Sequence, residues 1–378
     1  MSISPFQFYT TPAIVFGEGR AAELADHVGA TLGPRVLVVT DRGIVRLGLA
    51  DEALASFGNW ASATVFDGVE ADPSRATLEA AVERAREIEA TGILGFGGGS
   101  SLDAAKLTAL LAGSNEDLDT AWGVGQVRGP RLPLALVPTT AGTGSEVTPV
   151  SIITVGENEK RGVSSPLLLP DVAVLDPVLT HGLPADITAA SGVDAMVHAI
   201  EAYASRNANN NPMSRTLATR ALKLLADNIE AAVAGEREAR APMLLGSMLA
   251  GQAFANSPVA AVHALAYPLG GRFKVPHGLS NAVLLPHVLS FNAEEPTAAR
   301  AYDELAPLVG ARGPDGFIDR LAEISDSIGL TPGMRALGVD EEHLDQMAED
   351  AMLQTRLLVN NPRELRREDA RAIYEAAL

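Results

Sequence analysis

The sequence predicts two domains, an α/β domain with a parallel, Rossmann-like sheet over residues 1–184 and an all-α domain over residues 185–378. The first observation is length, because 378 residues exceed what a single hydrophobic core usually serves. The second is pattern: the first half alternates short apolar runs with longer amphipathic runs, whereas the second half consists of successive helix-type segments. We therefore expect the boundary near Pro184.

Short apolar segments in the first half have the length and composition of buried strands. Strands that alternate with helices predict a parallel sheet with helices on both faces, and the amphipathic segment after Pro73 is the clearest of these helices. The predicted helices occupy residues 19–33, 74–90 and 100–113. The predicted strands are AIVFG (13–17), RVLVVTD (35–41), ATVFDGV (63–69), GILGF (92–96) and PLALVPTT (133–140).

The second half has apolar residues that recur with helical periodicity, and few of its runs alternate as strands do. The stretch RNANNNP (206–212) is predicted to be a polar loop. The predicted helices occupy residues 186–205, 213–235, 237–256, 314–329, 341–358 and 367–378.

Composition excludes several classes of protein. No apolar run reaches about 18 residues, so we expect no membrane span. The N-terminus lacks a basic segment followed by an apolar one, so we expect no signal peptide and a cytoplasmic location. The absence of cysteine excludes disulfides, iron–sulfur clusters and thiolate metal sites. A net charge of −18 repels nucleic acid and anionic membranes, so neither is an expected partner.

Arginine dominates the basic residues, and two explanations remain open. A GC-rich genome favours arginine over lysine without any functional reason. A high-salt cytoplasm favours an acidic, lysine-poor surface, because salt screens the repulsion between like charges. The only lysines are Lys106, Lys160, Lys223 and Lys274.

Four residues of the second half form a pattern typical of a metal site. Asp194 and His198 stand four apart in SGVDAMVHAIEAY, so on a helix they share one face, a turn apart. His263 and His277 follow in AVHALAYPLGG and KVPHGLSNAVLLPHV. One carboxylate and three imidazoles suit a divalent iron, zinc or manganese ion. The alternative is that each histidine is an ordinary core or surface residue.

The stretch GFGGGSS lies between a predicted strand and a predicted helix, as phosphate-binding turns do. Gly97, Gly98 and Gly99 let the backbone approach an anion, and Ser100 or Ser101 is expected to cap the helix. The stretch lacks the full G-x-G-x-x-G spacing, so a simple tight turn is the alternative.

Asp41 ends the predicted strand RVLVVTD, where a carboxylate is suited to accept hydrogen bonds from a ribose 2′-OH. In the usual fingerprint this acid follows the glycines by about 20 residues. Here it precedes them, so the strand order differs from a standard Rossmann domain. Two alternatives stay open: Asp41 caps the segment DRGIVRLG, or Arg42 beside it turns toward the 2′-phosphate of NADP.

The segment PTTAGTGSEVT (138–148) is dense in small hydroxyl residues and directly follows a predicted parallel strand. Ligands gather at the carboxyl ends of such strands. Thr139, Thr140, Thr143 and Ser145 are suited to donate to a phosphate or an amide without adding charge. A loop without a ligand is the alternative.

These segments together resemble the iron-containing (group III) alcohol dehydrogenase family, in its metal-dependent branch. The resemblance extends over nearly the whole chain and implies a dinucleotide-binding α/β domain, a helical domain that holds a metal, NAD or NADP as cofactor, and frequent homodimers. The segments that carry it are VFGEG, VVTD, GFGGGSSLDAAK, PTTAGTGSEVT, LPDVAVLDPVLT, SGVDAMVHAIEAY, HALAYPLGG, PHG and NPRE.

The resemblance also assigns roles to individual residues. The metal ligands would be Asp194, His198, His263 and His277. The pyrophosphate would lie on Gly97, Gly98, Gly99 and Ser100. Other cofactor-binding residues would be Asp41, at the adenosine ribose, with Asp103, Thr139, Thr140, Thr143 and Ser145. Positions that line the substrate pocket in the family are matched by Phe254, Val259 and Ser151. Lys160 matches a basic position to which we assign no role.

Two positions distinguish this chain within the family. Many members carry a second histidine four residues after the first ligand of HALAxPLG, as a candidate proton relay, and this chain has Tyr267 there. Its hydroxyl either replaces that relay or fills the space. Maleylacetate reductases typically carry asparagine where this chain has Asp194, so the carboxylate favours a metal-dependent alcohol dehydrogenase.

The resulting hypothesis is a metal-dependent, NAD(P)-linked alcohol dehydrogenase or aldehyde reductase. Hydride would pass between a metal-bound alkoxide of a small alcohol and nicotinamide C4. Fe²⁺ is the expected metal, with Mn²⁺ or Zn²⁺ as alternatives. Within the family, a maleylacetate-type reductase or a hydroxyacid–oxoacid transhydrogenase is the alternative. Outside it, a dehydroquinate-synthase-like lyase or a non-catalytic binding protein remains.

Overall fold

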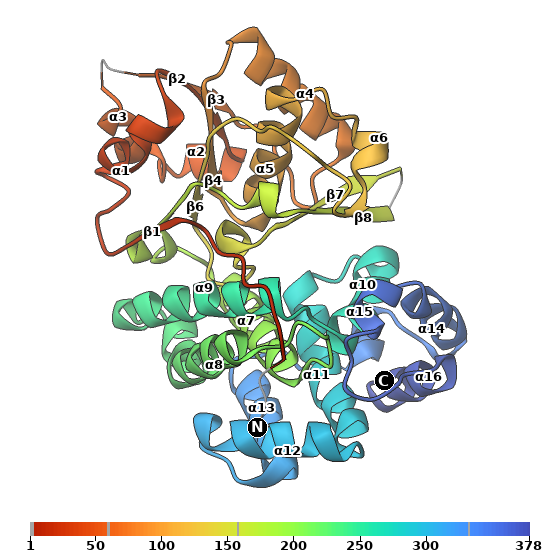
Figure 1. The fold of residues 1–378 in the computed structure, drawn as a ribbon. Helices are drawn as coiled ribbons and strands as arrows, with labels where there is room; N and C mark the ends of the chain where they lie inside the picture. Colours follow the sequence, from red (N-terminus) through yellow and green to blue (C-terminus); the bar gives the residue numbers. More distant parts are fainter. Residues whose placement is uncertain (1–3, 59–60, 157–158, 332) are drawn as a thin grey trace. The chain divides into compact units, whose positions relative to one another are not determined.

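The computed structural model describes residues 4–58, 61–156, 159–331 and 333–378. These residues form two compact units, shown in Figure 1. The first is the α/β unit Tyr9–Gly182, and the second is the helical unit Leu183–Leu378 together with residues 4–8. No helix among the described residues combines the length and apolar character that crossing a membrane requires.

The α/β unit is built on a six-stranded sheet in which every neighbouring pair of strands is parallel (Figure 1). The strand order is β1-β9-β6-β4-β2-β3, so the strand before the glycine-rich stretch lies at the centre. This confirms the predicted parallel α/β fold. The strands are β1 Ala13–Phe16, β2 Arg35–Val39, β3 Ser62–Phe66, β4 Gly92–Gly97, β6 Leu134–Pro138 and β9 Val172–Leu175.

Helices cover both faces of this sheet, and its central strands β4 and β6 are accordingly buried at every position. In β2, Val36 and Val38 pack in one core with helices α1 and α3, whereas Leu37 and Val39 pack in another core with α4 and α5. Alternate side chains of a strand point to opposite faces, so a strand covered on both sides has a continuous apolar run. The helices are α1 Leu24–Leu32, α2 Arg42–Arg46, α3 Asp51–Ser56, α4 Arg75–Glu87, α5 Gly99–Gly113 and α6 Leu118–Ala121.

A second, three-stranded sheet was not among the predicted elements. It has the order β5-β8-β7, with β7 and β8 antiparallel. Strand β8 has the sequence EKRGVS, which is polar and shows no apolar alternation. Its composition does not favour a strand, so it is pairing with β7 that stabilises β8. The strands are β5 Gly123–Val124, β7 Val150–Val155 and β8 Glu159–Ser164.

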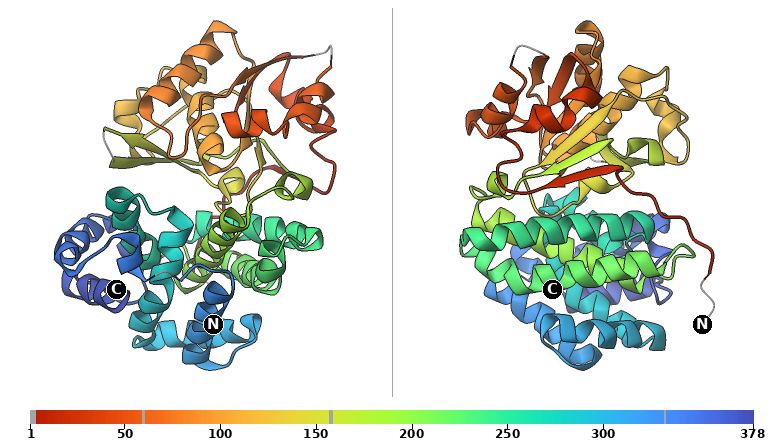
Figure 2. Two further views of the ribbon diagram at one scale, coloured as in Figure 1. Left: turned by 180° about the vertical axis from the view of Figure 1, so that it is seen from behind. Right: turned by 60° about the vertical axis from the view of Figure 1, so that its left-hand side comes forward.

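The helical unit confirms the all-α prediction for the second half. Helices α7, α8 and α9 pack side by side, as both views in Figure 2 show. Residues 205–211 join α7 to α8, which confirms the predicted polar loop except that Pro212 already begins α8. Asn209 in this loop exchanges two hydrogen bonds with the backbone of Gln7, which ties the start of the chain to this unit. The helices are α7 Ala185–Ala204, α8 Pro212–Val233, α9 Arg240–Asn256, α10 Ala261–Phe273, α11 His277–Ala293, α12 Pro296–Leu305, α13 Gly313–Ser327, α14 Leu344–Met352, α15 Thr355–Leu358 and α16 Arg367–Ala376.

Candidate metal centre and cofactor loop

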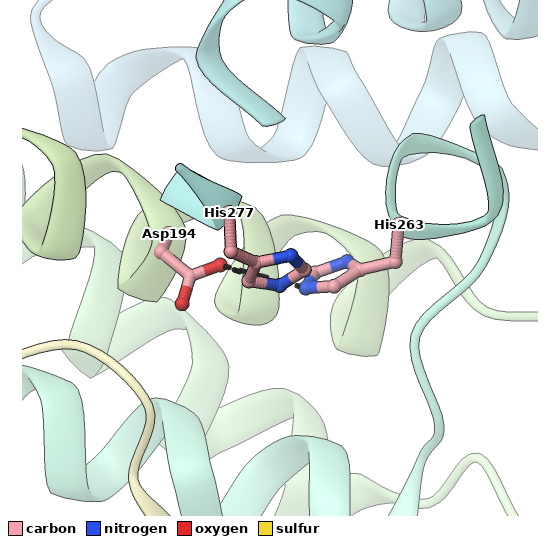
Figure 3. A group of neighbouring side chains, drawn as sticks. All are labelled: Asp194, His263 and His277. Atoms are coloured by element: carbon pink, nitrogen blue, oxygen red, sulfur yellow. Dashed lines mark ion pairs between the residues drawn. The ribbon is translucent and has the colours of Figure 1, made fainter. Parts of the chain in front are cut away.

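Three helices of the helical unit bring the four proposed metal ligands together. Helix α7 presents Asp194 and His198, α10 presents His263 from its first turn, and α11 begins at His277. The ligand atoms of Asp194, His263 and His277 all lie within 4.8 Å of one another (Figure 3). From Asp194 Oδ1, the Nε2 atoms of His263 and His277 lie at 3.6 Å and that of His198 at 3.8 Å.

This spacing fits a shared metal ion better than a hydrogen-bonded cluster. The separations are too long for hydrogen bonds. Bonds of about 2.0 to 2.2 Å to imidazole and carboxylate would place two ligands of one ion about 3 to 3.5 Å apart. The Nε2 atom of His263 is buried and has no hydrogen-bond partner among the described residues, as expected of an atom reserved for a metal. His277 is 43% exposed at its side chain, so the group is open on that side.

The electrostatics of the group keep its carboxylate ionised. Burial alone would raise the pKa of Asp194, but His198, His277 and His263 outweigh burial and hold it well below its usual value. Burial would likewise lower the pKa of His263, but Glu201 and Asp194 outweigh it and raise that pKa to about 9. In the metal-free protein His263 is therefore protonated at neutral pH, and a metal would displace that proton.

Two residues that contact this group were not predicted. Glu201 accepts a 2.6 Å hydrogen bond from Nδ1 of His263, and the Asn281 amide donates a 2.7 Å hydrogen bond to Asp194 Oδ1. The sequence spacing could have indicated Glu201, because residues 194, 198 and 201 fall on one helical face. Asn281 stands four residues after His277, which is the same kind of signal.

Two of the proposed pocket and relay residues lie against the metal ligands. The ring of Phe254 on α9 stacks on His198 with centroids 4.2 Å apart. The ring of Tyr267, one turn after His263 on α10, meets His277 edge-on at 6.4 Å. Val259 precedes α10, and its carbonyl oxygen accepts a 3.0 Å hydrogen bond from Asn360. Phe254, Val259 and Tyr267 are all partly exposed.

The glycine-rich stretch of the α/β unit forms an open helix start. The N-cap residue of α5 is Gly98, and no side-chain hydrogen bond caps this helix. The expectation that Ser100 or Ser101 caps it was therefore wrong. Both serines lie inside the helix, and Ser100 Oγ instead accepts from the backbone of Asp72. The first N–H groups of a four-turn helix thus lack a side-chain cap, which suits a phosphate.

Close packing explains the glycines themselves. A Cβ atom on Gly99 would lie 2.8 Å from Thr143, so only glycine lets the two loops meet. A Cβ atom on Gly98 would find nothing nearer than Thr140 at 3.6 Å, which leaves room above it. Gly97 has a φ angle of +147°, where side chains are strained, and its Cβ would lie 2.8 Å from Ser101.

Asp41 uses its two carboxylate oxygens differently. Oδ1 accepts hydrogen bonds from the backbone of Gly43 at 2.7 Å and Ile44 at 3.0 Å, and so caps the short helix α2. This is the capping alternative. Oδ2 lies 3.5 Å from the Cβ position of Gly97, so this oxygen faces the glycine stretch. Capping therefore leaves one oxygen for a ribose.

A buried lysine joins the hydroxyl-rich loop to helix α5. Lys106 is fully buried, and its Nζ donates to Ser145 Oγ at 2.7 Å, Thr148 Oγ1 at 3.1 Å and the Val150 carbonyl at 2.7 Å. Ser145 Oγ in turn donates to Asp103 Oδ1 at 2.5 Å. Burial lowers the pKa of Lys106. Ser145 and Asp103 thus fix the loop that carries Thr139, Thr140 and Thr143, of which Thr140 and Thr143 are partly exposed.

Ser151 and Lys160 are not part of the hydroxyl-rich loop. Ser151 is fully buried, and its hydroxyl donates to the carbonyl of Asp103, so we omit it from the proposed substrate pocket. Lys160 on β8 forms a 2.6 Å ion pair with Asp72, the residue whose backbone donates to Ser100. The lysine is thereby held near the end of the glycine stretch.

Comparison with known proteins shows the same architecture. The profile described as iron-containing alcohol dehydrogenase matches residues 11–177, and that of the C-terminal part of the Fe-containing alcohol dehydrogenase family matches residues 188–378. Long-chain-alcohol dehydrogenase 1 of Geobacillus thermodenitrificans (strain NG80-2) is 39% identical, with all of this chain and 97% of the relative covered.

Two solved structures are similar throughout. The crystal structure of a 1,3-propanediol oxidoreductase has a TM-score of 0.94 at 33% identity and covers 99% of this chain and all of its own. Sulfoacetaldehyde reductase from Bifidobacterium kashiwanohense, in complex with NAD⁺, has a TM-score of 0.90 at 29% identity, with 99% of this chain and 98% of its own covered. The chain therefore belongs to the iron-containing alcohol dehydrogenase family and is an oxidoreductase of alcohols and aldehydes.

Proposed function

We propose that Asp194, His198, His263 and His277 hold the divalent metal of this alcohol dehydrogenase. One observation carries the proposal: three imidazole nitrogens from three helices lie 3.6 to 3.8 Å from one carboxylate oxygen. Fe²⁺ is the metal we propose, and the same donors accept Mn²⁺ or Zn²⁺.

When bound, the metal would supply Lewis acidity at the substrate oxygen, and the nicotinamide would supply the hydride donor or acceptor. The contribution of the chain is positioning. Asp194 remains ionised beside the imidazoles, Phe254 holds the His198 ring by stacking, and the exposed side of His277 leaves the group open to a substrate. With Tyr267 edge-on to His277, we propose its hydroxyl as one step of the proton path.

We propose that the start of α5 and the hydroxyl-rich loop bind the cofactor pyrophosphate through Gly97, Gly98, Gly99 and Ser100. Two observations support this pyrophosphate site: the start of α5 has no side-chain cap, and there is room above Gly98. Asp103, Thr139, Thr140, Thr143 and Ser145 would form or fix the adjoining wall. NAD is the preferred cofactor in this proposal, because Oδ2 of Asp41 would repel a 2′-phosphate.

The substrate class follows from the lining near the metal group. Phe254 stacks on His198, and Val259 matches a pocket position of the family; both are apolar, so we propose a small primary alcohol or its aldehyde with an apolar substituent. A maleylacetate-type reductase would need cationic groups for two carboxylates, whereas the contacts described above for the metal ligands come from Glu201, Asn281, Phe254 and Tyr267. A transhydrogenase would instead need an oxoacid as hydride acceptor. A homodimer is the assembly we propose, as the family implies.

A substrate panel on metal-quantified protein tests this proposal. Oxidation of primary alcohols and reduction of aldehydes would be followed at 340 nm with NAD(H) and NADP(H), with and without a chelator. We expect turnover with simple alcohols, a preference for NAD, and loss of turnover on chelation. Turnover that survives complete metal removal would contradict the proposed function.

A further inference from the structure

Glu201 is a buried carboxylate that no step of the proposed chemistry uses. It lies on α7, its side chain is 5% exposed, and His263 is its only ion-pair partner in the part of the chain that the structure describes. Three donors satisfy it: Nδ1 of His263 at 2.6 Å, the backbone N–H of Ala260 at 2.9 Å, and that of Val262 at 2.7 Å. A buried charge is retained only where such donors compensate it.

The first consequence concerns the tautomer of His263. An ionised carboxylate is only an acceptor, so Nδ1 of His263 must carry the proton in this contact. In the neutral ring the lone pair is then on Nε2, the atom that lies 3.6 Å from Asp194 Oδ1. Glu201 thus presents the ring with its metal-binding nitrogen toward the other ligands.

The second consequence concerns the backbone that carries this ligand. Helix α10 begins after Ala260, which provides no side-chain cap. Glu201, on the neighbouring helix α7, supplies the missing cap, because its carboxylate accepts hydrogen bonds from the N–H groups at the start of α10. Side chains also fix the preceding turn: the Ser205 hydroxyl donates to the Pro258 carbonyl, and the Asn360 amide donates to the Val259 carbonyl.

We propose that Glu201 is the positioning residue of the metal centre, which fixes both the tautomer of His263 and the start of the helix that carries it. The inference rests on the proposed metal site. It goes beyond that site because Glu201 itself would not touch the metal. Carboxylates in this position typically contribute about 10- to 100-fold to metal affinity.

The test compares Zn²⁺ affinity in three variants of the full chain by competition with a chromophoric chelator. Glu201→Gln removes the charge and places an amide NH₂ against at least one N–H donor. Glu201→Asp keeps the charge on a shorter side chain. The matched control is Glu304→Gln, the same change at a 46% exposed glutamate that bonds Tyr203, the residue two positions after Glu201.

We expect Glu201→Gln to weaken Zn²⁺ binding about 10- to 100-fold, Glu201→Asp to weaken it less, and Glu304→Gln to leave it unchanged. A purely structural role would lower the melting temperature of metal-free and Zn²⁺-loaded protein equally. A positioning role also shrinks the rise in melting temperature that Zn²⁺ produces, because that rise follows the affinity.

Wild-type affinity in a folded Glu201→Gln variant would overturn the inference. If that variant does not fold, unchanged affinity in Glu201→Asp would overturn it equally. Asp194→Ala separates this failure from failure of the metal site: if it binds Zn²⁺ like the wild type, the proposed site is itself wrong, and the inference falls with it.

Discussion

Single residues in the metal group depend on one another for their charge. Glu201 and Asp194 raise the pKa of His263 to about 9, although burial opposes this. The three imidazoles in turn hold the pKa of Asp194 low. Asp194 is ionised as its type predicts, but His263 is protonated at a pH where a histidine is usually neutral, so removal of one partner changes the protonation of the others.

The first prediction is that metal binding tightens as pH rises. In the metal-free protein His263 is protonated up to about pH 9, and a metal needs its Nε2 lone pair. The apparent association constant for Zn²⁺ should therefore increase by up to about tenfold per pH unit between about pH 6.5 and 9, and then level off.

The same shift has a consequence for stability. A histidine whose folded pKa lies above its unfolded value of 6.5 stabilises the protein fully below 6.5, and this contribution is lost as pH rises through 9. The melting temperature of metal-free protein should thus fall across this range more than that of loaded protein. Zn²⁺ titrations and melting curves at several pH values measure both, and a pH-independent affinity would show that His263 is not a ligand.

The second prediction concerns Asp41 and cofactor choice. Asp41→Asn keeps the capping oxygen that accepts from Gly43 and Ile44 and removes the charge that faces Gly97. We expect the ratio of kcat/KM for NADP to that for NAD to rise on the order of tenfold, equivalent to about 1.4 kcal/mol. A wild-type enzyme that already prefers NADP would contradict the assigned role.

At the scale of elements, the glycine stretch and helix α5 work as one unit with the hydroxyl-rich loop. Gly99 lets Thr143 approach, and Lys106 fastens Ser145 to the same helix. The sequence was sufficient to predict the strand, the turn and the helix here. It was not sufficient to reveal Lys106, because a buried lysine depends on three oxygen acceptors that only the tertiary structure brings together.

The third prediction is that Gly98→Ala blocks the cofactor but not the fold. The added Cβ meets nothing nearer than 3.6 Å, and the backbone angles at Gly98 are ordinary for alanine. We expect the free energy of unfolding to change by about 1 kcal/mol or less. NADH should nevertheless bind at least about tenfold more weakly, since each 1.4 kcal/mol lost to the methyl group is tenfold in affinity.

Fluorescence titration with NADH measures this effect. Gly271→Ala is the matched control, because Gly271 lies in helix α10 and an added Cβ there meets nothing within 4 Å. It should bind NADH like the wild type. Unchanged NADH affinity in Gly98→Ala would place the pyrophosphate elsewhere.

Elements that depend on distant partners escaped prediction. Strand β8 forms through pairing with β7, and β9 has only four residues between two prolines, too few for a clear pattern. Helices α10 and α11 each contain a proline, and the start of α10 is capped from α7 rather than by its own sequence. Strongly periodic segments such as α4 and α8 were predicted with bounds close to those observed.

At the scale of the whole molecule, the net charge of −18 is the dominant feature. Of the four lysines, Lys106 is buried. The side chains of Lys160 and Lys223 are 25% and 43% exposed, and each forms an ion pair. Exposed pairs of this kind each contribute little to stability. Repulsion between like charges is therefore the term that salt changes most.

The fourth prediction is that KCl stabilises the protein only while it screens this repulsion. The Debye length falls to about 3 Å at 1 M salt, so we expect the melting temperature to rise at low KCl and level off by about 0.5 to 1 M. Melting curves at constant metal concentration test this, because bound metal shifts stability by itself. A steady rise into molar KCl would contradict simple screening and favour a high-salt adaptation.

The central claim is that a metal held by Asp194 and three histidines is required for alcohol oxidation. The most direct test measures metal content by elemental analysis and alcohol-dependent NAD reduction in wild type and in Asp194→Ala. Asp186→Ala, an exposed change on the first turn of the same helix, is the control. We expect about one divalent ion per chain in wild type and control, and neither metal nor activity in a folded Asp194→Ala variant. Full metal content and activity in that variant would contradict the account.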